Sequence, residues 1–198
     1  RTVPASARAR LQATEATVRS LEDPLVDDLV AGAGAWGASR LINRTARAFV
    51  DVNRDPGERD PRLSSDERGR DTPRTRAGLG VVPRLGGDGR VLYRGRLDPE
   101  EIEARIAAVH VPYHATLAEL MQAMRARFGR AVLIDWHSMP SAAAEAEGRR
   151  GGLSPDIVLG DRFGRSADPD IPALIRQVLE ARGRRVLMNR PFAGGHTT

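Results

Sequence analysis

The sequence predicts an α/β fold in which helices cover both faces of a mostly parallel or mixed sheet. Residues 131–135, 157–160 and 186–188 are short, continuous apolar runs, which are typical of strands buried on both faces. Segments with the three- to four-residue apolar spacing of a helix lie next to these runs, and the joins are short. This order of strand, helix and strand predicts parallel strands linked by right-handed crossovers.

The N-terminal quarter is expected to hold two helices and one strand. A loose helical stripe is formed by Leu11, Val18 and Leu21. Asp23 followed by Pro24 is typical of an N-cap with proline at the first helical position, and predicts a helix from there to about Gly32. Residues 48–52 are rich in β-forming side chains and predict a strand. Residues 55–80 are polar and predict a long loop that contributes little to a core.

The middle of the chain predicts a hairpin and a long helix. Residues 91–93 are a short strand candidate that follows a glycine-rich turn at residues 86–89. A helix is expected to begin after Asp98 and Pro99 and to end at Gly129, and proline at position 112 should kink or split it. Its apolar stripe comprises Ile102, Ile106, Val109, Tyr113, Leu117, Leu120, Met124 and Phe128.

The C-terminal part predicts one strand–helix–strand unit. The strands are residues 157–160 and 186–188, and the helix begins near Asp168 and Pro169. Its apolar positions are Ile171, Leu174, Ile175, Val178 and Leu179.

Composition excludes several classes of protein. The chain has 198 residues and no cysteine, so disulfides and thiolate metal sites are excluded. All 31 cationic residues are arginine, but 26 acidic residues are interspersed with them and only 4% of residues are aromatic, which argues against a nucleic-acid partner. No apolar run approaches the length of a membrane span, so no membrane partner and a cytoplasmic location are expected.

Polar side chains follow three of the predicted strands. They are residues 51–54, residues 135–140, and Asn189 with Arg190. Because ligands of open α/β sheets bind beyond the carboxyl ends of the strands, a site is expected where these clusters converge.

Each polar candidate has an ordinary reading beside a functional one. His137 can bind a metal or act as a base, and Asp135 can orient its imidazole or simply bond at the strand end. Asn53 and Arg54 suit a carboxylate, or Arg54 is a surface arginine. Asp23 is explained by helix capping or, less simply, by a metal.

His110 and His114 are four residues apart, a spacing that suits a metal on an unbroken helix. Pro112 lies between them, which favours a polar pair at a helix break. His114 belongs to a PYH string, so a role near the site is also open.

Six strings together resemble the N-formylglutamate amidohydrolase family. They are ARAFVDVNRDP (46–56), AGLGVV (77–82), VPYHATL (111–117), LIDWHSMP (133–140), PDIVLGDRFG (155–164) and NRPFAGG (189–195). The resemblance implies a three-layer α/β/α sandwich like that of the zinc exopeptidases, with distant similarity to zinc carboxypeptidases and aspartoacylases. It also implies a Zn²⁺ cofactor and hydrolysis of the formamide bond of N-formyl-L-glutamate, a small-molecule substrate.

The resemblance implies roles for particular residues. His137 would bind the zinc together with Asp23, for which Glu22 is a rival, and Asp135 would orient His137. Arg47 would polarise the scissile carbonyl. The substrate carboxylates would be bound by Asn53, Arg54 and Arg190.

The family pattern also contains strings that this chain does not. A Pro-His-Ser-Gly string with a further zinc ligand and a Gln-x-Glu string with the general base are absent. Residues 1–198 are therefore expected to form a single hydrolase domain that is a piece of a longer protein. The alternative functions are another zinc amidohydrolase, acting on an N-acyl amino acid or a C-terminal peptide, and a non-catalytic carboxylate-binding protein.

Overall fold

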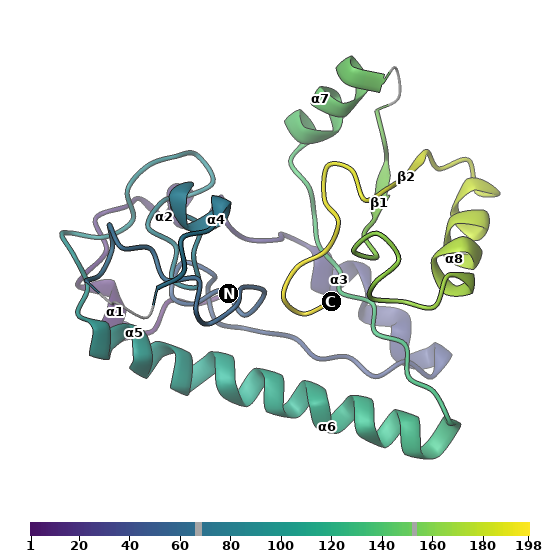
Figure 1. Cartoon of the computed structure of the whole chain (residues 1–198), viewed down its shortest axis with the longest axis horizontal. Helices are drawn as coiled ribbons and strands as arrows, with labels where there is room; N and C mark the ends of the chain where they lie inside the picture. Colours follow the sequence, from purple (N-terminus) through teal and green to yellow (C-terminus); the bar gives the residue numbers. More distant parts are fainter. Residues whose placement is uncertain (66–68, 152–153) are drawn as a thin grey trace. The chain divides into compact units, whose positions relative to one another are not determined.

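The computed structural model describes residues 1–65, 69–151 and 154–198 (Figure 1). These residues form two compact units, Arg1–Ile134 (unit 1) and Asp135–Thr198 (unit 2). A single domain over residues 1–198 stays a prediction.

Unit 1 contains several short helices and one long helical segment. The short helices are α1 (Ala5–Arg8), α2 (Glu15–Arg19), α3 (Val26–Leu29), the 3-10 helix η1 (Ala31–Trp36) and α4 (Pro73–Arg76). The long segment joins α5 (Pro99–Arg105), the π-helix η2 (Ile106–His110) and α6 (Val111–Phe128). Among the described residues of unit 1, strand pairing is limited to isolated bridges, so loops and helices are held together mainly by side chains.

The apolar core of unit 1 collects side chains from segments far apart in the sequence. Its members include Phe49, Val50, Leu63, Val81, Val82, Leu92, Tyr93, Leu97, Ile102 and Ile106. Burying one such side chain stabilises a fold by about 1.5–3 kcal/mol. Val50 directly precedes the polar residues 51–54, so the core fixes the start of that segment.

The predicted strand at residues 48–52 is wrong. These residues form turns, although Ala48, Phe49 and Val50 are fully buried as a strand core would be. Two of the carbonyls accept from side chains instead of from a neighbouring strand: the Tyr93 hydroxyl donates to Ala48 O, and Arg105 Nη1 donates to Phe49 O at 3.3 Å. The segment is therefore rich in β-forming side chains because it is buried, although it forms no β-ladder.

The predicted helix from Pro24 to Gly32 is only partly present. α3 begins at Val26, its N-cap is Leu25 in a left-handed conformation (φ 64°), and η1 follows it. The reading of Asp23 as a helix cap is therefore wrong, because its carboxylate instead pairs with Arg47.

The hairpin at residues 85–91 is confirmed, whereas the strand at 91–93 is reduced to two bridges. Val91 pairs with Leu85 and Tyr93 pairs with Leu11, both antiparallel. The glycine-rich turn closes through Gly86 N donating to Arg90 O at 2.8 Å.

The polar segment 55–80 contributes more to the interior than the sequence suggests. Leu63 belongs to the core, and Glu58, Arg59, Asp60 and Ser64 are also buried. Buried charges need partners, and Asp60 has one in Arg84, whose Nε lies 2.8 Å from Asp60 Oδ2. Residues 66–68 of this segment lie outside the described residues.

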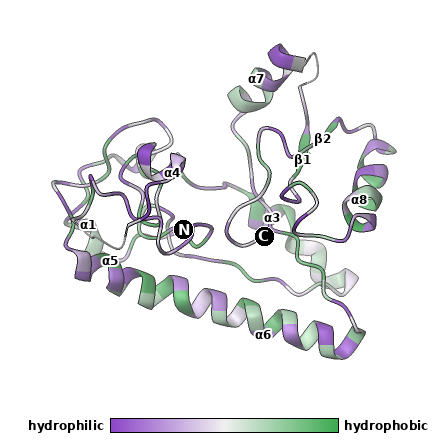
Figure 2. Ribbon diagram, in the orientation of Figure 1, coloured by the Kyte–Doolittle hydropathy of each residue, from purple (hydrophilic) through white to green (hydrophobic). Residues whose placement is uncertain are grey.

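The long helix is confirmed, and proline at position 112 interrupts its geometry. α5 begins at Pro99 after Asp98, and α6 ends at Phe128 with Gly129 (φ 73°) as its C-cap, as predicted. A proline ring collides with the carbonyl four residues earlier in an α-helix. In η2 the Val111 N–H instead bonds to Ile106 O, five residues back. This wider turn accommodates the ring. Figure 2 shows polar and apolar residues mixed along α6, none of which is fully buried.

The predicted strand at residues 131–135 is wrong. Val132 and Ile134 are each 52% exposed, and residues 131–134 form no backbone pairing with any described residue. A strand needs a neighbour for its hydrogen bonds, and the apolar run alone does not supply one.

Unit 2 confirms the predicted strand–helix–strand order. β1 (Ile157–Leu159) pairs in parallel with β2 (Val186–Met188), and α8 (Asp170–Glu180) connects them in sequence. The register places Ile157 opposite Val186. α7 (Ser141–Gly151) precedes the strands and was not anticipated by the apolar spacing.

The fold class is therefore α/β, with a small parallel sheet and helices. A sandwich of three layers stays a prediction. Of the helices in the described ranges, none combines the length and apolar character required to cross a membrane.

Candidate functional site

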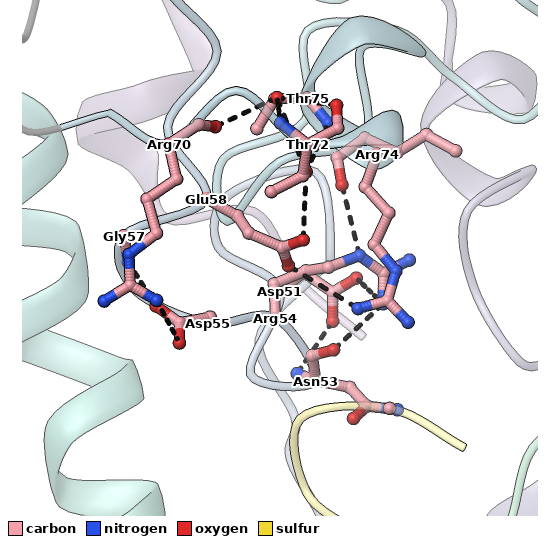
Figure 3. Close-up of polar contacts among 12 residues, drawn as sticks. Asp51, Asn53, Arg54, Asp55, Gly57, Glu58, Arg70, Thr72, Arg74 and Thr75 are labelled. Carbon is pink, nitrogen blue, oxygen red and sulfur yellow. Dashed lines mark hydrogen bonds and ion pairs between the residues drawn. The ribbon is translucent and has the colours of Figure 1, made fainter. Parts of the chain in front are cut away.

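The clearest polar constellation of unit 1 is a tight turn at residues 51–54 (Figure 3). Asp51 Oδ1 accepts from Asn53 N at 2.9 Å, and Asp51 O accepts from Arg54 N at 3.2 Å. Asp51 N donates to Val81 O at 2.7 Å, which ties the turn to the core. An aspartate that bonds the backbone two residues on stabilises such turns, so Asn53 and Arg54 are presented from a fixed backbone.

Two arginines approach the same oxygen of the buried Asp51 carboxylate. Arg47 Nε is 3.6 Å and Arg54 Nη1 is 3.7 Å from Asp51 Oδ2, and the Asp51 side chain is only 4% exposed. A buried carboxylate shared by two guanidinium groups offsets part of their mutual repulsion. Asp51 therefore allows two cations to lie close together.

The Arg54 guanidinium is held on one edge and open on the other. Its Nε donates to Leu79 O at 3.1 Å and its Nη1 to Asn53 O at 2.9 Å. Its Nη2 makes no hydrogen bond to any of the described residues. An arginine with a fixed plane and unused N–H donors is suited to a carboxylate.

The electrostatic surroundings of the two arginines differ. Burial opposes the charge of Arg47, but the carboxylates of Asp51, Asp23 and Glu22 outweigh it and raise the pKa of Arg47. Burial lowers the pKa of Arg54, Asp51 opposes this, and the positive charges of Arg74 and Arg47 lower it further. Arginine stays protonated at working pH in both cases. Arg54 is thus the less compensated cation, and an incoming anion is favoured there.

The segment that carries Arg74 is bonded to Glu58 (Figure 3). Thr72 caps α4 through a reciprocal capping box with Thr75, and Thr72 Oγ1 donates to Glu58 Oε1 at 3.1 Å. Glu58 Oε2 is buried, makes no hydrogen bond to the part of the chain that the structure describes, and lies 3.6 Å from Arg74 Nη1. Part of the polar segment 55–80 therefore brings a third cation into the neighbourhood of Arg54.

The two predicted carboxylate ligands contact Arg47. Asp23 Oδ2 lies 2.5 Å from Arg47 Nη2, and Glu22 Oε1 accepts from Arg47 N at 2.7 Å. Glu22 Oε2 also accepts from Arg1 Nη1 at 2.8 Å. The metal role of Asp23, with Glu22 as its rival, stays a prediction.

Two histidines of the long helical segment contact the backbone of the same turn. His110 Nε2 lies 2.8 Å from Arg54 O, and His114 Nε2 lies 2.8 Å from Val52 O. Sequence reasoning anticipated a polar pair at a helix break but not these partners.

Unit 2 holds the remaining predicted residues. His137 Nε2 lies 2.9 Å from Asp135 Oδ2, so the carboxylate and the imidazole do meet. Asn189 and Asp161 bond reciprocally, since Asn189 Nδ2 donates to Asp161 Oδ1 at 2.7 Å and Asp161 N donates to Asn189 Oδ1 at 3.0 Å. Arg190 follows on the exposed surface.

The predicted residues therefore divide between the units. Unit 1 brings Arg47, Asn53, Arg54 and Asp23 into one network, and unit 2 pairs Asp135 with His137. The contributions of Glu58 and Arg74 were missed, because the polar segment 55–80 offers no motif to single them out.

Comparisons with known proteins agree on one family. The family model for N-formylglutamate amidohydrolase matches residues 1–198. The chain is 37% identical over 166 residues to an N-formylglutamate deformylase of Pseudomonas aeruginosa and 31% identical over 165 residues to one of Pseudomonas putida. Each match covers 82% of this chain and 56% of the relative, so the chain spans about half the length of these curated relatives.

A solved structure is also similar. The crystal structure of N-formylglutamate amidohydrolase from Ralstonia eutropha JMP134 matches with a TM-score of 0.88 and 28% sequence identity. The match covers 98% of this chain and 70% of that one.

Proposed function

Because the chain belongs to the N-formylglutamate amidohydrolase family, we propose that the protein hydrolyses the formamide bond of N-formyl-L-glutamate to give formate and L-glutamate. The observation that carries the proposal is the Arg54 guanidinium, which is held on one edge and whose Nη2 makes no hydrogen bond to any described residue. Such a group is prepared for the carboxylate that distinguishes this substrate from a simple formamide.

Substrate binding is assigned to cationic and amide side chains. N-formyl-L-glutamate carries two carboxylates and therefore needs two or more cationic partners. Asn53 and Arg54 bind one carboxylate, and Arg190 is proposed for the other. The fixed turn at residues 51–54 lowers the entropy lost when these side chains engage the substrate.

Arg47 is proposed to stabilise negative charge on the formyl oxygen as the carbonyl is attacked. Its Nε and Nη2 face Asp51 and Asp23, and its Nη1 makes no hydrogen bond to any residue that the structure describes. Donors fixed before the reaction contribute a few kcal/mol in other hydrolases, typically about 3–4 kcal/mol. The acids around Arg47 fix its orientation for this role.

His137 and Asp23 are proposed to hold a zinc ion, with Asp135 orienting His137. Imidazole and carboxylate are ordinary zinc ligands, and a carboxylate bonded to the ligating histidine is the usual supporting partner, as the 2.9 Å contact between Asp135 and His137 provides. Zinc, when bound, would polarise the formyl oxygen and lower the pKa of a water molecule. Asp23 would meanwhile keep Arg47 in place.

A substrate panel tests the proposed function. The purified protein is given N-formyl-, N-acetyl- and N-succinyl-L-glutamate together with N-formyl-L-leucine, and release of the free amino acid is measured alongside bound zinc. We expect N-formyl-L-glutamate to have the highest kcat/KM and zinc to be stoichiometric. Preference for another acyl group would indicate a different amidohydrolase, and binding without turnover or zinc would indicate a carboxylate-binding protein.

A further inference from the structure

The backbone carbonyls on both sides of Asn53 are held by histidines. His114 Nε2 lies 2.8 Å from Val52 O, and His110 Nε2 lies 2.8 Å from Arg54 O. A carbonyl oxygen can only accept, so each imidazole carries its hydrogen on Nε2 and donates it. The turn that presents Asn53 and Arg54 is thus bonded by the long helical segment at two peptide groups, one on each side of the Asn53–Arg54 peptide.

The two imidazoles form one packed group. Their ring centroids are 4.4 Å apart, and the Tyr113 ring meets His114 edge-on at 5.3 Å. His110 is only 4% exposed. Rings packed in this way have little rotamer freedom, so the positions of their Nε2 atoms are well defined.

The sequence explains how both rings face the same turn. Proline at position 112 cannot fit a regular α-helix, and η2 (Ile106–His110) widens the helix just before it. His110 is the last residue of η2, and His114 lies in the first turns of α6. π-helical turns inside α-helices are frequent at functional sites, and here the π-helix lies where the helical segment contacts the turn at residues 51–54.

We infer that His110 and His114 are positioning residues for the proposed reaction, which fix the turn at residues 52–54 so that Asn53 and Arg54 meet the substrate carboxylate in one orientation. This inference rests on the proposed function. Neither histidine touches the substrate. Their effect reaches it through the backbone on which the Arg54 side chain stands.

The first test separates binding from turnover. His110→Ala and His114→Ala each remove one donor, and we expect each to raise KM for N-formyl-L-glutamate about tenfold, as the loss of one net hydrogen bond would, with kcat changed less than threefold. Glutamine places an amide donor near the position of Nε2, so His110→Gln and His114→Gln should recover most of the loss. Thr116→Ala, at an exposed residue of α6, is the matched control and should leave KM unchanged.

The second test asks whether the effect passes through Arg54. In an Arg54→Ala background, His114→Ala should raise KM no further, because the group that it positions is gone. Equal KM effects in both backgrounds, or a loss of kcat rather than a rise in KM, overturn the inference. So do glutamine variants that behave like the alanine variants while keeping the wild-type melting temperature.

Calorimetric binding of L-glutamate to the same variants separates this inference from the proposed function. Weaker glutamate binding by the alanine variants supports the positioning role even if the wild-type protein releases no formate, an outcome that would overturn only the proposed reaction. A wild-type protein that neither binds glutamate nor hydrolyses the substrate overturns both.

Discussion

The segment 46–54 of unit 1 and the β1–α8–β2 segment of unit 2 hold their backbones by different means. In unit 2, peptide groups of β1 and β2 bond to each other in a parallel register. In segment 46–54, the carbonyls of Ala48, Phe49 and Arg54 accept hydrogen bonds from the side chains of Tyr93, Arg105 and His110, respectively. The first arrangement is local and repetitive, whereas the second depends on single side chains from distant segments.

This difference has a functional consequence. A ladder directs alternate side chains to its two faces, so neighbouring residues such as Asn53 and Arg54 would point apart. A turn held by side chains can direct both toward the same ligand. A turn held by side chains is also more sensitive to mutation than a ladder, because one substitution leaves a buried carbonyl or charge without its partner.

The largest effect is expected at the open cation of segment 46–54. Arg54→Ala removes the guanidinium proposed to pair with a substrate carboxylate, and should raise KM for N-formyl-L-glutamate by about 100-fold, as the loss of a charge-assisted bidentate contact implies. Steady-state kinetics measure it. Arg54→Lys keeps the charge but loses the planar fork, so its KM should lie between those of the wild type and Arg54→Ala. An unchanged KM would remove Arg54 from substrate binding.

The next effect concerns the buried acid that keeps two arginines together. Asp51→Asn preserves shape but leaves Arg47 and Arg54 without their shared counter-ion, and should lower the free energy of unfolding by about 2–4 kcal/mol. Urea denaturation measures it. Asp156→Asn in unit 2 is the control, because that ion pair with Arg185 lies at the surface and should leave the midpoint nearly unchanged. Equal shifts in the two variants would show that burial is not what matters.

The contrast between the two regions also explains what the sequence could predict. Helix 99–128 and the β1–α8–β2 order follow from apolar spacing and from the glycine and proline residues at their ends. The same reasoning failed at residues 48–52 and 131–135, where the apolar runs form no strand ladder with any described residue. The apolar spacing indicates which residues tend to be buried, but it does not indicate which other segment lies beside them to form backbone hydrogen bonds.

The site was predictable to a similar degree. The string that contains Asn53, Arg54 and Arg47 is specific enough to single out these residues, and the structure brings them into one network. The partners of His110 and His114 lie 56 and 62 residues away. No local sequence pattern predicts a hydrogen bond between residues so far apart in the chain.

A smaller effect is expected at Tyr93, whose buried hydroxyl donates to Ala48 O and accepts from Arg105 Nη1 at 2.7 Å. Tyr93→Phe removes both bonds and should lower the free energy of unfolding by about 1–2 kcal/mol. Burial also raises the pKa of Tyr93, despite the opposing charge of Arg105. A group with a raised folded-state pKa stabilises the fold below its unfolded pKa, about 10 for tyrosine, and loses that contribution as pH rises further.

Unfolding of the wild type and of Tyr93→Phe at pH 8 and pH 11 therefore tests this contribution. The wild type should lose more stability over that range than the variant does. Parallel losses would mean that the Tyr93 hydroxyl does not titrate with unfolding.

The smallest effect is expected at the start of the two strands of unit 2. Asp156 accepts from Arg185 N at 2.8 Å and from its Nε and Nη2 at 3.1 and 2.7 Å. These bonds to Arg185 lower the pKa of Asp156 well below its ordinary value. A depressed folded-state pKa stabilises the fold above the unfolded pKa of about 4 and ceases to do so as pH falls through the folded value.

Nuclear magnetic resonance of the Asp156 carboxyl carbon measures that titration directly, and Arg185→Lys sharpens the comparison. The lysine keeps a charge and the backbone donor but loses Nε and Nη2, so the pKa of Asp156 should move back toward its ordinary value while β1 and β2 stay paired. Loss of the strand pairing in Arg185→Lys would show that unit 2, like segment 46–54, depends on a single side chain, and the contrast between the two regions would fail.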